Sequence, residues 1–178
     1  MDTNQKPNKP NKPIRVQIRP VKLGDLAQVI AVNEASLAEN YPRGLWLNKF
    51  PECKPYSFVA VVLNQVVGYV FSCGDMVISV AIYEEYRGKG IGRALMENCL
   101  NARLATRVQS GSDASGNDIL RLHVRTTNER AIALYTNLGF HVDKTVVDYY
   151  VNPTCDAFEM VNQLDGKHKY TKRDRFVV

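Results

Sequence analysis

The chain has 178 residues and a mass of 20.1 kDa, which suits one domain with short flanking segments. Hydrophobic residues make up 45% and charged residues 23%, a composition that excludes a collagen or a wholly disordered chain. No apolar run approaches the roughly 20 residues that a membrane span needs, so we expect no membrane partner.

The net charge of +5 lies mainly at the two ends of the chain. Residues 1–15 and 165–178 each carry a net charge of +3, whereas residues 16–164 hold 14 basic and 15 acidic side chains. This near-neutral centre argues against specific nucleic-acid recognition, for which a basic face is typical. The basic ends are suited to a phosphate backbone, so ribosome association through them is a hypothesis.

The four cysteines, Cys53, Cys73, Cys99 and Cys155, follow no CxxC or cysteine–histidine ligand spacing. Since the first residues do not resemble a secretory signal, we expect reduced thiols in a cytoplasmic protein. The three histidines are too scattered along the sequence to indicate a site, so we expect no metal.

In chain order, an arm rich in lysine, proline and asparagine comes first. Proline recurs at every third position from Pro7 to Pro13, which removes backbone donors and predicts a disordered arm over residues 1–13. Apolar and polar residues then alternate over 14–19, the period of a strand. After Pro20, Asp25 is placed to cap a helix. The domain is expected to span residues 14–164.

Strands and helices alternate along this domain, which indicates an α/β fold with a mixed central β-sheet flanked by helices. A Gly-, Ser- and Asp-rich stretch over 109–118 predicts a loop, and residues 165–178 a basic tail. The further strands are predicted over 57–62, 66–73, 77–82, 120–124, 139–147 and 157–161, and helices are predicted after the glycines at 88–92 and over 128–138.

The segment most informative about chemistry lies between a predicted strand and a predicted helix. It reads Arg87-Gly88-Lys89-Gly90-Ile91-Gly92-Arg93. Glycines let backbone N–H groups approach an anion, and a helix N-terminus adds aligned donors and partial positive charge. The spacing matches neither a Walker A loop nor GxGxxG. We predict a pyrophosphate cradle to which Arg87, Lys89 and Arg93 add positive charge.

The same segment resembles the acetyl-CoA signature (Arg/Gln)-x-x-Gly-x-(Gly/Ala) of the GCN5-related N-acetyltransferases, or GNAT superfamily. A second stretch, from Leu122 to Tyr135 and on through Leu138-Gly139-Phe140, is also similar to that family. The resemblance runs over about 16–164 and implies the GNAT fold, with acetyl-CoA as cosubstrate at the splayed central strands. The implied cofactor contacts are Val80, Ala81, Ile82, Arg87, Gly88, Lys89, Gly90, Ile91, Gly92, Arg93, Asn128 and Tyr135.

Within the family, the chain most resembles protein N-terminal acetyltransferases of the archaeal and the NatA and NatE catalytic-subunit types. Three segments carry this likeness: Leu37-Ala38-Glu39-Asn40-Tyr41-Pro42, Leu122-His123-Val124-Arg125, and Asp148-Tyr149-Tyr150 with Asp156-Ala157-Phe158. The resemblance implies transfer of acetyl from acetyl-CoA to the free α-amine of a protein N-terminus. It also leaves open whether the enzyme needs an auxiliary subunit.

The reaction implied by this resemblance is a direct attack of a neutral amine on the thioester within a ternary complex. An α-amine has a pKa near 8 and needs only modest help from a base. The implied catalytic residues are Glu39, a general base acting through a water, His123, a second base, and Tyr135, which meets the departing thiolate. A solvated carboxylate and a hydrogen-bonded core histidine are the structural alternatives for the first two.

Two further expectations concern the central strand at 77–82. Some relatives carry a histidine or tyrosine at the position of Met76, and methionine cannot move a proton, so no base is expected there. We expect an irregularity of the sheet near Ile82, where a backbone N–H would hold the oxyanion.

The acceptor peptide is expected between the loop at Leu37–Tyr41 and the pair Tyr149 and Tyr150. Leu37 and Tyr41 would line the pocket for the first side chain, with small residues preferred and Met-initiated acceptors still open. The alternative for the tyrosine pair is ordinary half-buried aromatics of a strand.

Four other functions compete with this prediction. One is a ribosomal-protein acetyltransferase of the bacterial type, and a second is a GNAT enzyme for lysine or a small amine. The non-enzyme readings are a ribosome- or nucleic-acid-binding module and an inactive acetyl-CoA sensor. Acetylation of lysine, with a pKa of about 10.4, would demand a stronger base than an α-amine does.

Overall fold

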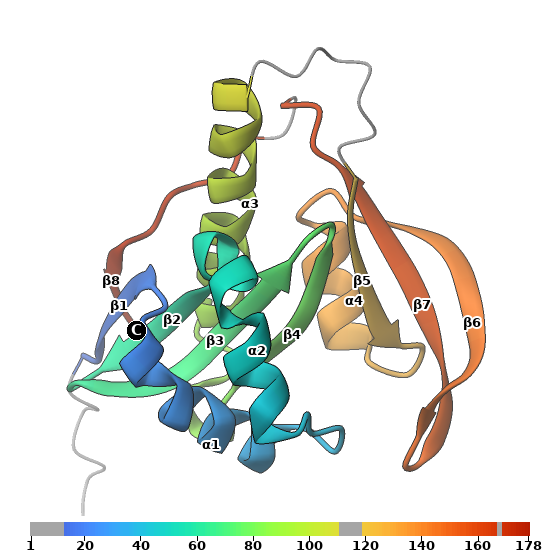
Figure 1. Ribbon diagram of the computed structural model, residues 1–178, viewed down its shortest axis with the longest axis horizontal. Coiled ribbons are helices and arrows are strands. Elements are labelled where there is room, and N and C mark those ends of the chain that lie inside the picture. Colours follow the sequence, from blue (N-terminus) through green and yellow to red (C-terminus); the bar gives the residue numbers. More distant parts are fainter. Residues whose placement is uncertain (1–12, 111–118, 167–168) are drawn as a thin grey trace, which may run out of the picture.

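The computed structural model describes residues 13–110, 119–166 and 169–178, and the predicted arm falls outside it except for residue 13 (Figure 1). The strands are β1 (Arg15–Pro20), β2 (Phe58–Val62), β3 (Gln65–Cys73), β4 (Met76–Ile82), β5 (Ile119–Arg125), β6 (His141–Val151), β7 (Thr154–Gln163) and β8 (Arg175–Val177). The α-helices are α1 (Leu26–Ser36), α2 (Arg43–Cys53), α3 (Ile91–Ser110) and α4 (Glu129–Thr136).

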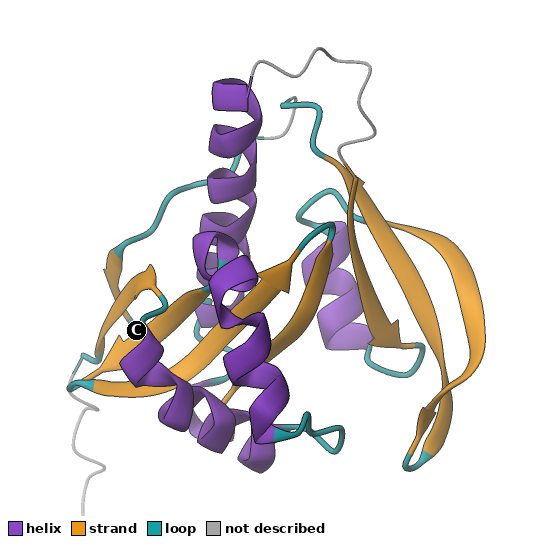
Figure 2. Cartoon of the chain, in the orientation of Figure 1, coloured by secondary structure: helices purple, strands orange, loops and turns teal. Residues whose placement is uncertain are grey.

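The strands form one eight-stranded sheet in the order β6-β7-β5-β4-β3-β2-β1-β8. Strands β4 and β5 are parallel neighbours, and the other neighbouring pairs are antiparallel. The parallel pair is joined only at Met76↔Arg121 and Val77↔Leu122, after which β4 and β5 diverge. This confirms the predicted mixed sheet with splayed central strands (Figure 2).

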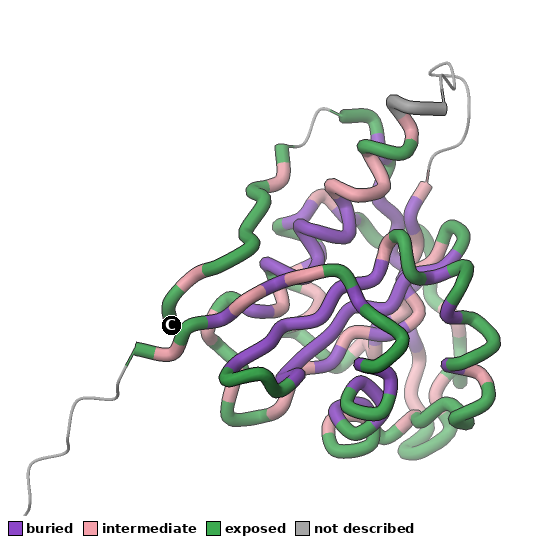
Figure 3. The backbone as a smooth tube through the Cα atoms, turned by 60° about the vertical axis from the view of Figure 1, so that its left-hand side comes forward, coloured by how far each residue is buried: buried purple, intermediate pink, exposed green. Residues whose placement is uncertain are grey.

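Helices cover both faces of the sheet because the central strands are apolar on both sides. All five residues of β2 are buried, as are eight of the nine residues of β3 (Figure 3). Helices α1 and α2 pack on one face, in a core with Val59, Tyr69 and Phe71. Helices α3 and α4 pack on the other face, with Ala60, Val70 and the apolar side of β5 and β7. The sheet is therefore packed between two layers of helices.

Helix α2 was not among the predicted elements. Trp46, Phe50 and Cys53 are its buried residues, at spacings of four and three that suit one helical face. Pro42 precedes the helix and Pro51 lies inside it, and prolines usually mark boundaries. Packing of Trp46 against Tyr69 and Phe71 outweighs that local signal, because a fully buried tryptophan contributes several kcal/mol.

The expectation of four reduced cysteines is wrong, because Cys53 and Cys73 form a disulfide. The bond joins the end of α2 to the end of β3, two segments that only the fold brings together. Cys99 and Cys155 are free thiols. Cysteine spacing along the sequence carries no information about such a pair, so the argument from cysteines to a cytoplasmic location no longer holds.

The predicted loop and tail both contain regular structure. Helix α3 continues to Ser110, so residues 109–110 are helical, and residues 111–118 lie outside the described part. The tail's Arg175–Val177 forms β8, which pairs with β1 at the edge of the sheet. Phe176 packs on the core, which a charge count over 165–178 does not reveal. No helix within 13–110, 119–166 and 169–178 is long and apolar enough to cross a membrane.

Candidate functional site

A cavity of about 340 Å³ opens where β4 and β5 separate. It collects residues from four distant parts of the chain: the loop after α1, β4, β5 and the end of β6. Its lining is Leu37, Glu39, Asn40, Tyr41, Met76, Val77, Ile78, Ser79, Val80, His123, Tyr149, Tyr150 and Val151. This one cavity is therefore bordered by the residues expected around the acceptor and by both expected bases, together with Met76: Leu37, Glu39, Tyr41, His123, Tyr149 and Tyr150.

A larger hollow, of about 560 Å³, lies at the β1–β8 edge. It is lined by Arg15, Val16, Gln17, Val61, Leu63, Asn64, Arg175, Phe176 and Val177. None of the predicted site residues borders it. The smaller cavity is the better candidate because it combines titratable groups with partly buried aromatic rings.

Tyr149 and Tyr150 both border the cavity because β6 is irregular just before them. Consecutive strand residues normally point to opposite faces of a sheet. Here the β6–β7 register shifts between Val146 and Tyr150, and Asp148 adopts a positive φ of 51°. Its N–H donates to Oδ1 of Asp156 at 2.9 Å, which holds the bulge. Burial raises the pKa of both tyrosines above the usual value, so they stay neutral donors.

Glu39 lies at this cavity in contact with Arg125, a residue that the sequence analysis missed. The Nη2 of Arg125 bonds to Oε1 of Glu39 and to the carbonyl of Asn152 at 3.1 Å. Its guanidinium also stacks 4.2 Å above the ring of Tyr150. Arg125 therefore connects the α1 loop with the β6–β7 hairpin. The alternation of β5, which puts residues 121, 123 and 125 on one face, was the signal that could have found it.

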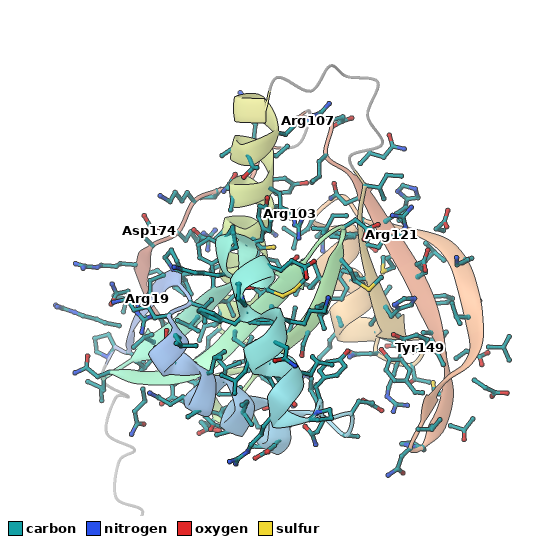
Figure 4. All side chains as sticks on the ribbon, viewed as in Figure 1. Arg19, Arg103, Arg107, Arg121, Tyr149 and Asp174 are labelled. Carbon is teal, nitrogen blue, oxygen red and sulfur yellow. A yellow bond between two sulfur atoms is a disulfide. The ribbon has the colours of Figure 1, made fainter. Side chains whose placement is uncertain are left out.

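His123 is held between a ring and a carboxylate. The ring of Tyr149 stacks on the imidazole at 4.3 Å with an interplanar angle of 18°. Nε2 of His123 lies 3.2 Å from Oε2 of Glu159 on the neighbouring strand β7. Figure 4 labels Tyr149 and also Arg121, two residues before His123 on β5. The histidine is therefore a partly exposed cavity residue with a charged partner, which favours a chemical role over a core role.

The glycine-rich turn leads into the N-terminus of α3, which begins at Ile91. Gly88 and Gly90 have φ values of +73° and +77°, which L side chains rarely adopt, and a Cβ at either would meet no atom within 4 Å. The first N–H groups of a helix have no partner within it. The turn thus leaves open space beside unpaired donors, as an anion cradle requires.

The three predicted cations around this turn, Arg87, Lys89 and Arg93, differ in their partners. Nε of Arg87 donates to the carbonyl of Ile82 at 3.0 Å, which ties the turn to the end of β4. Arg93 pairs instead with Glu97, one helical turn further on, at 2.9 Å. The charge of Arg93 is therefore locally compensated. Nζ of Lys89 donates to the carbonyl of Glu85 at 2.5 Å, a neutral partner that leaves the charge of Lys89 uncompensated by this contact.

Asn128 immediately precedes α4 and is exposed, whereas Tyr135 lies near the end of α4 and is buried. The side chain of Asn128 caps the helix by accepting from the N–H of Ala131 at 3.2 Å. Tyr135 is buried beside Phe140, and this burial raises the pKa of its phenol to about 12. Such a phenol keeps its proton at neutral pH and can only act there as a hydrogen-bond donor or acceptor.

The expected irregularity of the central strand lies elsewhere than predicted. The β3–β4 register skips Ile78, with Phe71↔Ser79 and Ser72↔Val77 as partners. At the end of β4, Gly68↔Ile82 is a regular pair, so the prediction of a break near Ile82 is wrong. The break lies beside the cavity, where the Ser79 hydroxyl bonds to Tyr69 at 2.7 Å. Local pairing with β3 decides its position, and no strand pattern reveals it.

Comparison with known proteins gives this geometry a context. An acetyltransferase (GNAT) domain matches residues 54–142. The N-alpha-acetyltransferase of Saccharolobus solfataricus is 32% identical over 163 residues, covering 83% of this chain and 92% of that protein. A Dictyostelium discoideum N-terminal acetyltransferase complex ARD1 subunit homolog is 34% identical, covering 82% and 72%. The crystal structure of Ard1 from Thermoplasma volcanium has a TM-score of 0.70 at 28% identity, covering 83% and 96%.

Proposed function

The chain belongs to the GNAT acetyltransferase family and is an acetyl-CoA-dependent N-acetyltransferase, and we propose that its acceptor is the free α-amine of a protein N-terminus. The observation that carries this proposal is the single cavity bordered by Glu39, His123, Tyr149 and Tyr150, at the divergence of β4 and β5. In this proposal, an extended chain end enters the cavity from one side and the thioester from the other. The relatives named N-alpha-acetyltransferase support the same acceptor.

In this proposal Glu39 takes the proton of the attacking amine through a water. The amine nitrogen attacks the thioester carbonyl, and the C–S bond breaks as the amide forms. Because an α-amine has a pKa near 8, part of it is already neutral at pH 7. The contact with Arg125 engages one carboxylate oxygen of Glu39, and a carboxylate has about four acceptor positions. Acceptor capacity thus remains for a water.

His123 and Tyr135 have separate tasks. His123 is the second base, since Met76 at the start of β4 cannot move a proton. Tyr135 carries a phenol that stays protonated, because burial raises its pKa to about 12, so it can donate a hydrogen bond to the leaving thiolate. The tyrosine pair would orient the peptide backbone by hydrogen bonds to its carbonyls.

The residues for acetyl-CoA are those around the start of α3. The N–H groups at the turn Gly88–Gly92 would hold the pyrophosphate, with Lys89 adding charge. Val80 and Ile82, which are partly buried against the core on the α3 side, would border the path of the cofactor. Asn128, at the start of α4, would lie near the pantetheine arm. Acetyl-CoA supplies the activated acyl group, and the chain supplies its placement.

Substituting Gly90 by alanine is expected to lower the free energy of unfolding by about 1–2 kcal/mol, because a Cβ is strained at a positive φ. The added methyl also faces the cradle, so the KM for acetyl-CoA is expected to rise while that for peptide is unchanged. Urea unfolding and steady-state kinetics measure both. Gly44→Ala, in α2 with no atom within 4 Å of its Cβ and no positive φ, is the matched control. An unchanged KM in both variants would contradict the cradle.

The acceptor is tested with peptides that vary in their first two residues, each with a free or a blocked N-terminus and an internal lysine. We expect transfer to free N-termini and at most trace transfer to blocked ones, because lysine has a pKa of about 10.4 against about 8 for the α-amine. Equal rates on blocked and free peptides would make the enzyme a lysine acetyltransferase. Including the N-terminus of a small-subunit ribosomal protein tests the bacterial-type alternative.

An auxiliary subunit, a cytoplasmic location and ribosome contact through the basic ends stay predictions. The Dictyostelium relative is named as a subunit of a complex, which supports the first of them for this chain. The second and third have no support from the fold. Part of the C-terminal segment proposed for ribosome contact is strand β8, whose Arg175 is exposed.

A further inference from the structure

A charged row crosses three strands beside the cavity. His123 on β5 and Lys144 on β6 are both register partners of Glu159 on β7. The carboxylate of Glu159 lies 3.2 Å from Nε2 of His123 and 3.3 Å from Nζ of Lys144. Nε of Arg121 lies 3.7 Å away. The residue Glu159 itself is only 8% exposed.

The buried carboxylate of Glu159 has three charged or titratable partners, and one of them indicates a role in the reaction. A buried charge costs free energy unless it is paired, and Glu159 is paired with cations on both neighbouring strands. The side chain of Lys144 is 59% exposed, so water solvates its charge and the ammonium needs no contact with Glu159. Arg121 already has a partner in Asp75, at 2.5 Å. His123 alone of these three borders the cavity, so the pair that matters for chemistry is His123–Glu159.

The contact between His123 and Glu159 decides which nitrogen of the His123 imidazole carries the proton. An ionised carboxylate only accepts hydrogen bonds, so the nitrogen facing it, Nε2, is the one that bears hydrogen. Nδ1 is then the unprotonated nitrogen and the only one that can take up a proton. The stacked ring of Tyr149 holds the plane of the imidazole.

We propose that Glu159 is a positioning residue that keeps His123 in the Nε2–H form and stabilises the imidazolium that forms during the reaction. The proposal rests on the function proposed above. An acceptor that arrives as an ammonium loses two protons. The first N–H bond breaks before the attack and its proton bonds to Nδ1 of His123, and the second proton goes to Glu39 through the water as the amide forms. The positive charge on the imidazole ring is balanced by Glu159. The proton then passes to solvent and neutral His123 returns. Glu159 touches neither substrate and acts through His123.

Replacing Glu159 by glutamine tests this role, because the amide keeps the shape, removes the charge and presents a donor as well as an acceptor to Nε2. We expect kcat to fall about tenfold, less than the hundredfold or more for loss of a base itself. The KM values for peptide and acetyl-CoA should stay unchanged. In the ¹⁵N spectrum, His123 should change from the Nε2–H form to a mixture of both forms. An unaltered spectrum together with an unaltered kcat would overturn the proposal.

Asp75→Asn is the matched control, because it removes a carboxylate that pairs with Arg121 but does not border the cavity. Its kcat and its His123 spectrum should match the unmodified protein. In a double-mutant cycle, Glu159→Gln should cost nothing further once His123 is alanine. A full tenfold loss in that background would show a structural role and overturn the proposal.

The ¹⁵N spectrum of His123 distinguishes failure of the Glu159 proposal from failure of the proposed α-amine acceptor. It is recorded on the free protein, with the signals of the three histidines assigned by His123→Ala. A predominant Nδ1–H form in the unmodified protein would overturn the role of Glu159 even if Glu159→Gln did not fold. A predominant Nε2–H form in a protein that acetylates no free N-terminus would preserve the pair and reject the acceptor.

Discussion

Replacing Glu39 by glutamine is expected to lower kcat about a hundredfold, the low end for loss of a general base. Glutamine keeps the length of the side chain and an oxygen that accepts from Arg125, so the loop after α1 should keep its place. What it loses is the capacity to take a proton from the amine. The KM for peptide should change little, because the cavity wall is unchanged. Steady-state rates with a peptide that begins with serine measure both constants.

The matched control for this substitution is Glu34→Gln. Glu34 is an exposed carboxylate on α1, five residues earlier, and is outside the cavity lining. Its kcat should stay within error of the unmodified enzyme. A near-normal kcat for Glu39→Gln would remove Glu39 from the role of base and leave His123 as the remaining candidate. Loss of the same size in both variants would point to a change in overall charge instead.

Substituting Trp46 by alanine is expected to lower the free energy of unfolding by about 3–5 kcal/mol, the usual cost of truncating a buried large aromatic residue. Trp46 is fully buried, and its ring lies edge-on to those of Tyr41, Tyr69 and Phe71, with centroids 5.0–5.9 Å away. These contacts join α2 to β3 and to the acceptor loop. Urea unfolding followed by circular dichroism measures the loss.

A second substitution at this site separates stability from acceptor binding. Trp46→Phe keeps an aromatic ring but removes the N–H that donates to the carbonyl of Tyr41 at 3.3 Å. We expect a smaller loss of about 1–2 kcal/mol, near the value of one hydrogen bond with some repacking, and a higher KM for peptide. The neighbouring Leu47 is 56% exposed, so Leu47→Ala should cost at most about 0.5 kcal/mol. If the Trp46→Ala protein were as stable as the Leu47→Ala protein, that result would contradict the anchoring role of Trp46.

The parts of the site that sequence reasoning predicted share one property: their signal is local. The turn at Gly88–Gly92 combines glycines, cations and the start of a helix within a few residues. Resemblance to relatives then assigned roles to Glu39, His123 and Tyr135, which no periodicity distinguishes from other side chains of the same kind.

The parts that were missed depend on residues far apart in the chain. Helix α2 carries prolines at unfavourable places, and its stability comes from Trp46 packing against β3. The disulfide Cys53–Cys73 has no sequence motif. The shift at Ile78 depends on how β4 pairs with β3, and the carboxylate that faces His123 comes from β7, 36 residues later.

By itself, the sequence determined most of the strands and helices, the glycine-rich turn before α3 and the near-neutral centre between basic ends, because periodicity, turn residues and charge act over a few neighbours. Only the tertiary structure decided that Arg125 bonds to Glu39, that Glu159 faces His123, and that residues 175–177 form the edge strand β8. These contacts result from strand register and from burial, which depend on the packing of the whole chain.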